Sequence, residues 1–549
     1  MIDYCTFQRV FSLLGSHRYV ISIFACLSLS TAVGDSGMCE TSIVAQDEID
    51  ELLAMTDDQL LRSVQKATFR YFWDFAHPVS GLIRERETSG ELVTMGGSGF
   101  GIMAILVGIE NDFITREQGT IRTLKILRFL QNADRFHGAF PHWMNGSTGR
   151  VIPFSPRDDG GDLVETAFLM QGILTARAFF DQNSEAEQEI QTLSTGLWED
   201  VEWNWYRKQT QDQLFWHWSP NQEFDINLPI RGWNETMIAY ILAIAAPTQG
   251  VPADLYHRGW AGPNYRNGGN HYGYKLEVGR DTGGPLFFTH YSFLGFDPRG
   301  KRDAYANYFF QGVNQTRINR AWCIENPKNY LGYGADCWGL TASDDPDGYK
   351  AHAPNLSNDN GTITPSAGIS SIVYTPQESI GLIRSLLAKH REKVWGRFGF
   401  YDAFNESRNW FTQAYLAIDQ GPIICMIENH KTGLLWDLFM SNPEITEAMD
   451  KIGFVQDAAT TALEQKNKIF ELSPNPTSQS EVRLHTLGLN LSQKSISLYS
   501  LDGRFISEID LLDDRLKMPA NLDSGIYLLV IEGSGFRETH KLSILAQAL

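Results

Sequence analysis

The chain is poor in cysteine and in positive charge. Its 549 residues include six cysteines, and no two of these have the spacing of a zinc-binding or redox pair. It has 46 basic and 65 acidic residues, which gives a formal net charge of -19. Nucleic acids and anionic lipid surfaces bind basic patches, so this balance argues against both as partners. No metal or other cofactor is expected.

Beyond its N-terminus the chain also lacks an apolar run long enough to span a bilayer. Near the N-terminus, Arg9 and Arg18 precede the short apolar stretch YVISIFACLSLSTAVG, which leads into small residues. We therefore expect residues 1–34 to be an export signal, and we expect no stable membrane insertion of the mature protein. Of the cysteines outside this segment, Cys323 and Cys337 are near enough in sequence to close a short disulfide loop in an oxidising compartment.

The chain is rich in aromatic residues and in helical patterns. Half of its 14 tryptophans fall between Trp198 and Trp260. Apolar residues recur at helical spacing from Asp57 to about Phe454, and several of these helices are apolar nearly all round, so they are buried on both sides. This pattern predicts an all-α architecture in which an outer ring of helices wraps an inner ring, with long loops at one end.

The character of the chain changes near Leu472. The segment ELSPNPTSQSEVRLHTL is rich in Pro, Ser and Asn, and alternating segments with an Asp-Gly turn follow it. We predict a helical domain over residues 50–455, a linker over 456–470 and a small β-sandwich over 471–549.

Residues 157–170, RDDGGDLVETAFLM, place four acids beside a strongly apolar run. Asp162 and Glu165 have the spacing of a capping box, which explains them structurally. Asp158 and Asp159 are left unexplained. Together with Asp162 they also match the DDxxD magnesium–diphosphate motif, but that motif requires one continuous helix, which the two glycines should break.

Two further acids are predicted at helix starts. Asn234 can cap a helix and place Glu235 in its first turn, close to Arg231 and Trp233. Pro422 suits the first position of another helix, with Asp419 just outside it. If the inner helices point the same way round a ring, these carboxylates converge.

Converging carboxylates suit glycoside hydrolysis, in which one carboxylic acid protonates the leaving oxygen and another carboxylate activates water or attacks. Aromatic loops would then provide stacking platforms for sugar rings. A helix N-terminus lowers a carboxyl pKa, so Glu235 as the general acid requires burial to outweigh the helix dipole.

Several long segments resemble the bacterial glycoamylase-like family, which includes the endo-β-1,2-glucanases of glycoside hydrolase family 144. They include TFRYFWDFAHPVSGLIRERE, ADRFHGAFPHWMNGSTG, DDGGDLVETAFLMQGILTAR, NLPIRGWNE, CWGLTASDDPDGY and AIDQGPIICMIENHKTGLLW. The resemblance runs over roughly residues 57–454. It implies an (α/α)6 barrel that hydrolyses β-1,2-glucan with inversion, by endo or sophorose-releasing exo action and without a metal.

By position, the resemblance places Asp158, Asp162 and Glu165 on the family's acidic cluster and Glu235 on its general acid. Asp419 is an additional candidate for the base, and the choice among these acids stays open. The candidates for a sugar-binding wall are His142, Trp143, Trp216, His217, Trp218, Arg231, Trp233, His290 and Tyr291.

The C-terminal segments LSPNPTS, ISLYSLDGR, LDSGIYLLVIEG and HKLSIL are similar to type IX secretion sorting domains of Bacteroidota. This likeness implies passage through the periplasm to the cell surface or medium, with the type IX machinery as a partner. The alternatives for the helical domain are a glucan hydrolase of another linkage or an exo enzyme, a polysaccharide lyase, and a non-catalytic glycan-binding protein.

Overall fold

The computed structural model describes residues 47–457, 470–473, 481–486, 495–500, 504–512, 515–519, 522, 524–533 and 536–544. The expected export signal therefore lies outside the described residues. The chain divides into two compact units, residues 1–456 and 457–549. Within the described residues, no helix combines the length and the apolar character that crossing a membrane requires.

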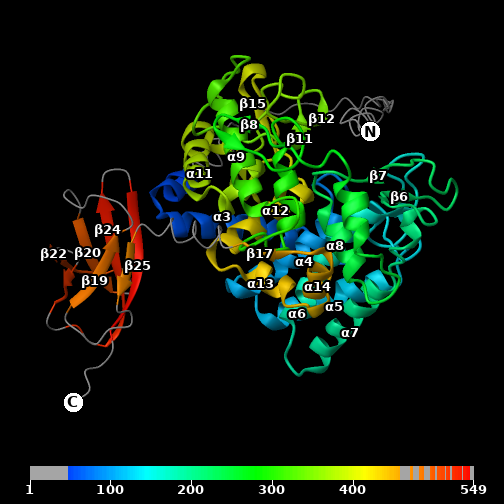
Figure 1. Ribbon diagram of the computed structural model, residues 1–549, viewed down its shortest axis with the longest axis horizontal. Helices are drawn as coiled ribbons and strands as arrows, with labels where there is room; N and C mark the ends of the chain where they lie inside the picture. The colour runs from blue at the N-terminus through cyan, green and yellow to red at the C-terminus, as the bar shows by residue number, and fades with distance from the viewer. Residues whose placement is uncertain are drawn as a thin grey trace, which may run out of the picture. The chain divides into compact units, whose positions relative to one another are not determined.

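The first unit is built from two layers of helices (Figure 1). The inner helices are buried nearly all round, which matches their apolar sequences. Going round the ring they are α4 (Met95–Glu110), α6 (Leu163–Phe179), α8 (Met237–Ala245), the short helices η4 (Leu286–Thr289) and η5 (Tyr291–Phe293), α10 (Pro365–Ser370) with η6 (Ser371–Val373), and α12 (Ala417–Lys431).

The outer elements alternate with the inner ones along the chain and present one face to them. They are α3 (Asp57–Asp74), α5 (Arg116–Gln131), α7 (Glu185–Glu199), the π-helix η3 (Tyr256–Ala261), α9 (Tyr308–Glu325) and α11 (Pro376–His390). Thr56 and Thr115 cap α3 and α5 with complete capping boxes. This alternation is an (α/α)6 barrel, which confirms the predicted fold class.

Hydrogen bonds and packing close the inner ring. Helix α4 packs against both α6 and α12, and α8 packs against α6. Between η5 and η6, the buried ring of His290 bonds Ser371 Oγ at 3.0 Å, and Tyr374 donates to the backbone oxygen of Thr289 at 2.7 Å. The short 3-10 segments at this point therefore take the place of a sixth long inner helix.

Short antiparallel strands link the loops at the mouth of the barrel. The pairs are β1 (Leu92–Thr94) with β2 (Trp143–Asn145), β2 with β3 (Val151–Ile152), β4 (Gly161–Asp162) with β6 (His217–Trp218), β5 (Leu214–Phe215) with β7 (Pro229–Ile230), β8 (Asn270–His271) with β9 (Tyr274–Lys275), β11 (Ala342–Asp345) with β12 (Gly348–Ala351), β13 (Trp395–Gly396) with β14 (Gly399–Phe400), and β15 (Phe404–Asn405) with β16 (Trp410–Phe411).

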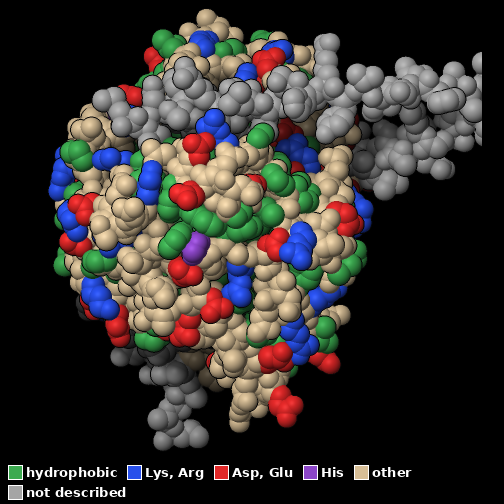
Figure 2. Space-filling model, turned by 90° about the vertical axis from the view of Figure 1, so that its right-hand side faces the viewer, with side chains coloured by type: hydrophobic (Ala, Val, Ile, Leu, Met, Phe, Trp, Pro, Cys, Tyr) green, Lys and Arg blue, Asp and Glu red, His purple; other side chains and the backbone are tan. Residues whose placement is uncertain are grey.

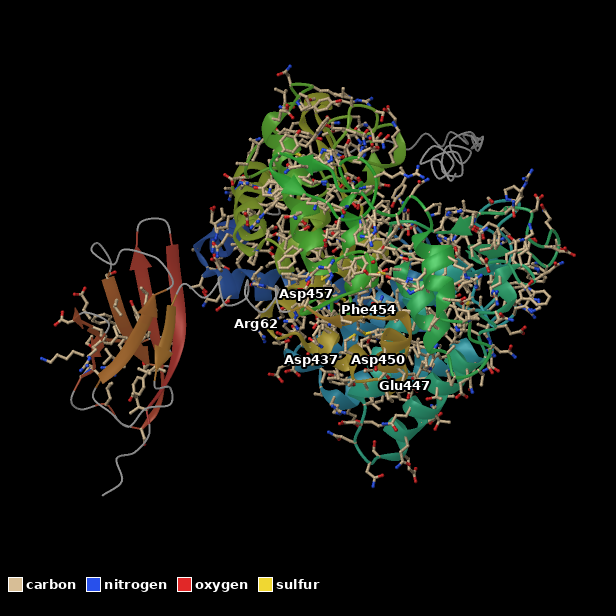
Figure 3. The ribbon with its side chains drawn as sticks, in the orientation of Figure 1. Arg62, Asp437, Glu447, Asp450, Phe454 and Asp457 are labelled. Carbon is tan, nitrogen blue, oxygen red and sulfur yellow. The ribbon has the colours of Figure 1, made fainter. Side chains whose placement is uncertain are left out.

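The first unit ends with two further helices and a strand, α13 (Leu434–Met440), α14 (Pro443–Ile452) and β17 (Val455–Gln456). Strand β17 pairs with β10 (Lys301–Arg302). Phe454, between α14 and β17, packs its ring against Tyr256, Phe296 and Tyr308 (Figure 3). The end of the unit is thus attached to the barrel through both backbone and side chains.

The second unit is a β-sandwich, as predicted. One sheet has the order β18 (Phe470–Ser473), β19 (Glu481–Thr486), β23 (Arg515–Lys517), β22 (Leu511–Leu512), and the other β21 (Phe505–Glu508), β20 (Ser495–Ser500), β24 (Gly525–Gly533), β25 (Phe536–Ile544). Leu498, Leu516, Leu529 and Leu542 come from both sheets and form one core.

Candidate active site

The start of α6 holds the first group of acids. Asp162 is the N-cap, and its Oδ1 accepts hydrogen bonds from the backbone N–H groups of Val164 and Glu165, both at 2.9 Å. Glu165 does not complete a capping box. Its carboxylate instead accepts from the Gly96 N–H at 2.6 Å and from Thr94 Oγ1 at 3.2 Å, at the start of α4. Asp162 therefore caps α6 as predicted. Glu165 does not belong to the cap and instead joins α6 to α4.

The two glycines before Asp162 have a structural explanation. A Cβ on Gly160 would lie 2.0 Å from the backbone oxygen of Trp218, and one on Gly161 would lie 2.1 Å from the Tyr206 hydroxyl. These glycines let β4 approach β6 closely. Asp159 points away from the other acids and accepts from Ser219 Oγ at 2.5 Å and Asn221 at 2.6 Å. The three aspartates do not share one helix, so the DDxxD interpretation is wrong.

Asp158 is a buried carboxylate whose oxygens accept no hydrogen bond within the described part of the chain. His217 Nε2 lies 3.1 Å from its Oδ1, but that nitrogen also accepts the Gly160 N–H at 3.2 Å. Buried polar atoms are nearly always hydrogen-bonded. The two oxygens of Asp158 are therefore buried acceptors with unused capacity beside His217.

His142 joins this group through a 2.8 Å contact between its Nδ1 and Asp162 Oδ2. Burial opposes a charge on the imidazole, but Glu165, Asp162 and Asp158 outweigh it and raise the pKa of His142 to about 9. His142, Asp158 and Asp162 place their ligand atoms within 4.8 Å of one another, as a metal site would. The 2.8 Å contact and the surrounding negative charges make these side chains an ion-pair network.

Glu235 lies just before α8, whose N-cap is Thr236. The prediction that Asn234 caps this helix is wrong: the Asn234 side chain accepts from the N–H and hydroxyl of Thr236, and the helix begins later. Glu235 thus lies outside the first turn of α8. Inside that turn, the helix dipole would lower the pKa of its carboxyl. Burial instead raises the pKa of Glu235 to about 7, and the charge of Glu165 adds to this effect. The influence of Glu165 places Glu235 beside the first group of acids.

Asp419 lies in the first turn of α12, which begins at Ala417. The prediction that Pro422 opens the helix is wrong, because the helix begins before the proline and accommodates it in its interior. Asp419 is buried, and its Oδ1 accepts from Ser366 Oγ, at the start of α10, at 3.5 Å. Burial raises the pKa of Asp419 to about 7.

Sequence reasoning missed a second acid beside Asp419. Asp402 lies before β15, accepts the Asp344 N–H at 2.7 Å and forms a coupled carboxyl pair with Asp419. Burial raises the pKa of Asp402, and the charge of Asp419 raises it further. Arg86 contacts Asp344 and Glu85 nearby. Asp402 is recognisable as a site residue only because its carboxyl is buried beside that of Asp419. That proximity is visible in the structure and not in the spacing of the sequence.

One residue connects the two groups of acids. Tyr291, in η5, is buried; burial first, and then negative charges that include Asp419 and Glu235, raise the pKa of its phenol. Both carboxyls therefore act on the same phenol. The acids lie at the starts of α6, α8 and α12, and hydrogen bonds join the start of α6 to that of α4 and the start of α12 to that of α10. The convergence expected from the helix starts is what the structure shows.

The structure divides the predicted sugar-binding wall into two sets. Trp143, Trp218, Arg231 and His142 are partly exposed, whereas Trp216, His217, Trp233, His290 and Tyr291 are buried. Trp233 donates to Gln315 at 2.8 Å and stacks on Tyr308, and His290 closes the ring through Ser371. The exposed set is better placed to meet a sugar. Figure 2 shows one face on which hydrophobic side chains gather beside a histidine, with charged side chains around them.

The predicted disulfide between Cys323 and Cys337 is wrong. Both side chains are buried free thiols in the structure. Cys323 belongs to α9 and interacts with the backbone of Gly339. Cys337 instead faces His390 and Glu406. The two thiols influence one another but form no disulfide, which sequence separation alone does not reveal.

Comparisons with known proteins place this geometry in a family. A family model described as "Putative glucoamylase" matches residues 227–443. The chain is 48% identical over 420 residues to an exo β-1,2-glucooligosaccharide sophorohydrolase of Parabacteroides distasonis, covering 72% of this chain. The chain spans 58% of the length of that curated relative.

Solved structures agree. An endo-β-1,2-glucanase from Chitinophaga pinensis, in complex with sophorotriose and glucose, is 50% identical, with a TM-score of 0.72 over 73% of this chain and 99% of that one. An endo-β-1,2-glucanase from Talaromyces funiculosus has a TM-score of 0.50 over 72% of this chain and 91% of its own, at 11% identity, and so shares the fold alone. Half of the aligned residues are identical along nearly the whole solved chain from Chitinophaga pinensis, and the protein therefore belongs to the glycoamylase-like family.

Proposed function

We propose that this protein is an inverting β-glucan hydrolase whose substrate is β-1,2-glucan. The observation that carries the proposal is the pair of buried acids, Glu235 and Asp419, at one barrel mouth. Inverting hydrolysis needs an acid on one side of the glycosidic bond and a base that activates water on the other. The two relatives at about half identity, the exo enzyme of Parabacteroides distasonis and the endo enzyme of Chitinophaga pinensis, are both named for action on β-1,2-linked glucose.

Glu235 has the properties of the general acid. Burial raises the pKa of its carboxyl to about 7, so a large fraction stays protonated near neutral pH. The carboxyl donates its proton to the leaving oxygen, directly or through a substrate hydroxyl. Burial here outweighs the helix dipole because Glu235 precedes the first turn of α8.

Asp419 is the base in this proposal. Asp162 and Glu165 use their oxygens to hold the backbones of α6 and α4, which removes them from the choice. Asp158 belongs to the same group of acids as Glu165, whose charge raises the pKa of the proposed general acid Glu235. Asp419 comes from another inner helix and acts on Tyr291 as Glu235 does, has a buried oxygen without a hydrogen bond, and shares a pair with Asp402.

The remaining side chains would bind and orient the sugar. Asp158, beside His217, has unused acceptor capacity in its two buried oxygens, which we assign to hydroxyl groups of the sugar. Protonated His142 donates to hydroxyls and keeps Asp162 in place. The partly exposed rings of Trp143 and Trp218 provide faces for stacking on pyranose rings.

A panel of β-1,2-, β-1,3-, β-1,4- and α-1,4-glucans tests the proposal. We expect new reducing ends from the β-1,2-glucan, with the α-anomer formed first, as inversion requires. Sophorose as the sole early product would indicate exo action, and a ladder of lengths would indicate endo action. An unsaturated product that absorbs in the ultraviolet would indicate a lyase, and binding without new reducing ends a glycan-capture protein; either result would refute hydrolysis.

We also propose that the chain is exported and sorted by its C-terminal unit. The support is the N-terminal apolar stretch and the likeness of the tail to type IX sorting domains. In a Bacteroidota host, deletion of residues 471–549 should leave the enzyme in the periplasm, and deletion of residues 1–34 should leave it in the cytoplasm. Release of the tail-less chain into the medium would contradict the sorting role.

A further inference from the structure

Three side chains with metal-ligand chemistry meet in the first unit at a place that the proposed hydrolysis does not use. They are Cys337, His390 and Glu406, and their ligand atoms lie within 4.8 Å of one another. Cys337 closes a tight turn that pairs with Gly334, His390 is the last residue of α11, and Glu406 begins the 3-10 helix η8 (Glu406–Arg408). Three separate elements thus present a thiol, an imidazole and a carboxylate to one point.

His390 is the member of this cluster whose ring nitrogen has unused hydrogen-bonding capacity. Its ring is 7% exposed and packs against the rings of Phe404 and Phe411, with centroids 4.8 Å and 5.5 Å away. Its Nε2 lies 3.1 Å from Glu406 Oε1 without forming a hydrogen bond. A buried ring nitrogen aimed at a carboxylate, with no bond of good geometry, is unusual in a folded protein.

The carboxylate of Glu406 is held in place by neighbours. Lys389 contacts its Oε1 at 2.6 Å. Asn405 caps η8 by accepting the Arg408 N–H at 3.1 Å, and its amide donates to Asn360 and Thr362. Partners that orient a ligating group in this way are typical of metal sites.

The thiol of Cys337 is buried and free, and it faces this cluster. Cys323, the other buried thiol nearby, is outside the cluster. A thiolate, an imidazole and a carboxylate together suit Zn²⁺ and similar divalent transition metals, whereas Ca²⁺ and Mg²⁺ prefer oxygen ligands alone. The spacing of cysteine pairs does not reveal this ligand set, because it contains a single cysteine.

We propose that Cys337, His390 and Glu406 bind a zinc-type divalent ion. The thiol loses its proton to solvent as the sulfur–metal bond forms. The thiolate and the carboxylate, which also contacts Lys389, then offset most of the charge of the ion. Three protein ligands leave a fourth position for water. The ion would join the end of α11, the turn at Cys337 and the start of η8, and so stabilise this side of the barrel.

Cobalt binding by the whole chain tests the site, because Co²⁺ replaces Zn²⁺ and reports its ligands by absorption. After treatment with a chelator, we expect about one Co²⁺ per chain, a thiolate-to-cobalt charge-transfer band, and loss of the band when Zn²⁺ is added. Cys337→Ser should abolish the band. Cys323→Ser and Cys425→Ser remove buried thiols outside the cluster and should retain it. Absence of the band in the wild-type chain, or its persistence in Cys337→Ser, would overturn the proposal.

A second pair of variants keeps the test decisive if Cys337→Ser fails to fold. His390→Gln and Glu406→Gln should each weaken Co²⁺ binding about tenfold or more. Zn²⁺ should raise the unfolding temperature of the stripped wild-type chain and leave that of His390→Gln nearly unchanged. Equal affinity of wild type and His390→Gln would refute the assignment of this ligand and, with it, the site.

Discussion

The carboxylate of Glu165, in the first turn of α6, accepts a hydrogen bond at 2.6 Å from the backbone N–H of Gly96, in the first turn of α4. A side chain on one inner helix thus serves an unpaired backbone donor of the next. The contact aligns the starts of two neighbouring helices, and it leaves no room for a side chain on Gly96, whose Cβ would lie 2.8 Å from the same carboxylate. The acids of the mouth therefore have fixed positions before any ligand arrives.

Glu235→Gln should reduce turnover of β-1,2-glucan by about 10²- to 10⁴-fold, because the amide cannot donate the proton that a general acid supplies. Glu447→Gln is the matched control, since Glu447 is exposed on α14 (Figure 3). The control should keep full activity. Reducing-end assays on both variants make the measurement, and full turnover by Glu235→Gln would remove the acid assignment.

The pH profile of kcat/KM should decline on its alkaline side as the pH rises through about 7. The reason is that burial raises the pKa of Glu235 to about 7 and the acid must be protonated to act. Initial rates at low substrate concentration over a series of buffers check this. An alkaline limb that begins far above this range would mean that another group supplies the proton.

Glu235 should also make stability depend on pH. Its pKa is about 7 in the folded protein, against an ordinary value of 4.5, so the folded state holds a proton that the unfolded state has lost between these values. The contribution of Glu235 to the free energy of unfolding is therefore fully present below about pH 4.5. It is lost as the pH rises toward 7, and the loss amounts to about 3 kcal/mol.

Glu235→Gln should remove that loss. Urea unfolding at pH 5 and pH 8 should show a smaller difference for Glu235→Gln than for wild type, and Glu447→Gln should behave as wild type. An unchanged difference in Glu235→Gln would show that the carboxyl titrates normally.

Asp419→Asn should lower turnover by about 10²-fold or more, because the amide cannot accept a proton from water. Asp450→Asn on α14 is the control and should be neutral, since Asp450 is exposed. Asp402→Asn should retain more activity than Asp419→Asn, since Asp402 acts through its partner. If Asp402→Asn were the more damaged variant, the roles of the two acids would be exchanged.

Asp162→Ala should destabilise the protein by about 1–2 kcal/mol, since it removes two hydrogen bonds to the first turn of α6. It should also lower the activity, because His142 loses its partner. Ser184→Ala removes the cap of the outer helix α7 and should cost about 1 kcal/mol without changing kcat. Denaturant unfolding and turnover, measured together, separate these effects, and equal turnover in both variants would contradict the role of His142.

The helical periodicity and the apolar inner helices were sufficient to predict the two-layered barrel, and the acids at helix starts were sufficient to predict a common mouth. Exact helix boundaries were not predictable. Thr236, and not Asn234, occupies the N-cap position of α8, and its side chain makes no capping hydrogen bond; the backbone path alone decides where this helix begins.

Long-range pairs were out of reach as well. Asp402 and Asp419 come from different segments, and their pairing depends on how the loop before β15 folds over the start of α12. The same reason explains the wrong disulfide: Cys337 and Cys323 are close in sequence, yet the turn at Gly334 directs Cys337 toward α11. Sequence spacing reports neighbours along the chain, whereas these sites depend on neighbours in space.

The pairing of β17 with β10 defines where the barrel unit can be shortened. A protein expressed up to Gln456 keeps this last pairing and the ring of Phe454 against its three aromatic neighbours. A truncation a few residues earlier exposes those rings to water and frees the edge of β10, so it should yield insoluble material. If the tail is removed in the sorting role proposed above, we expect the cut to lie after Gln456, because only then does the barrel unit keep its last strand pairing.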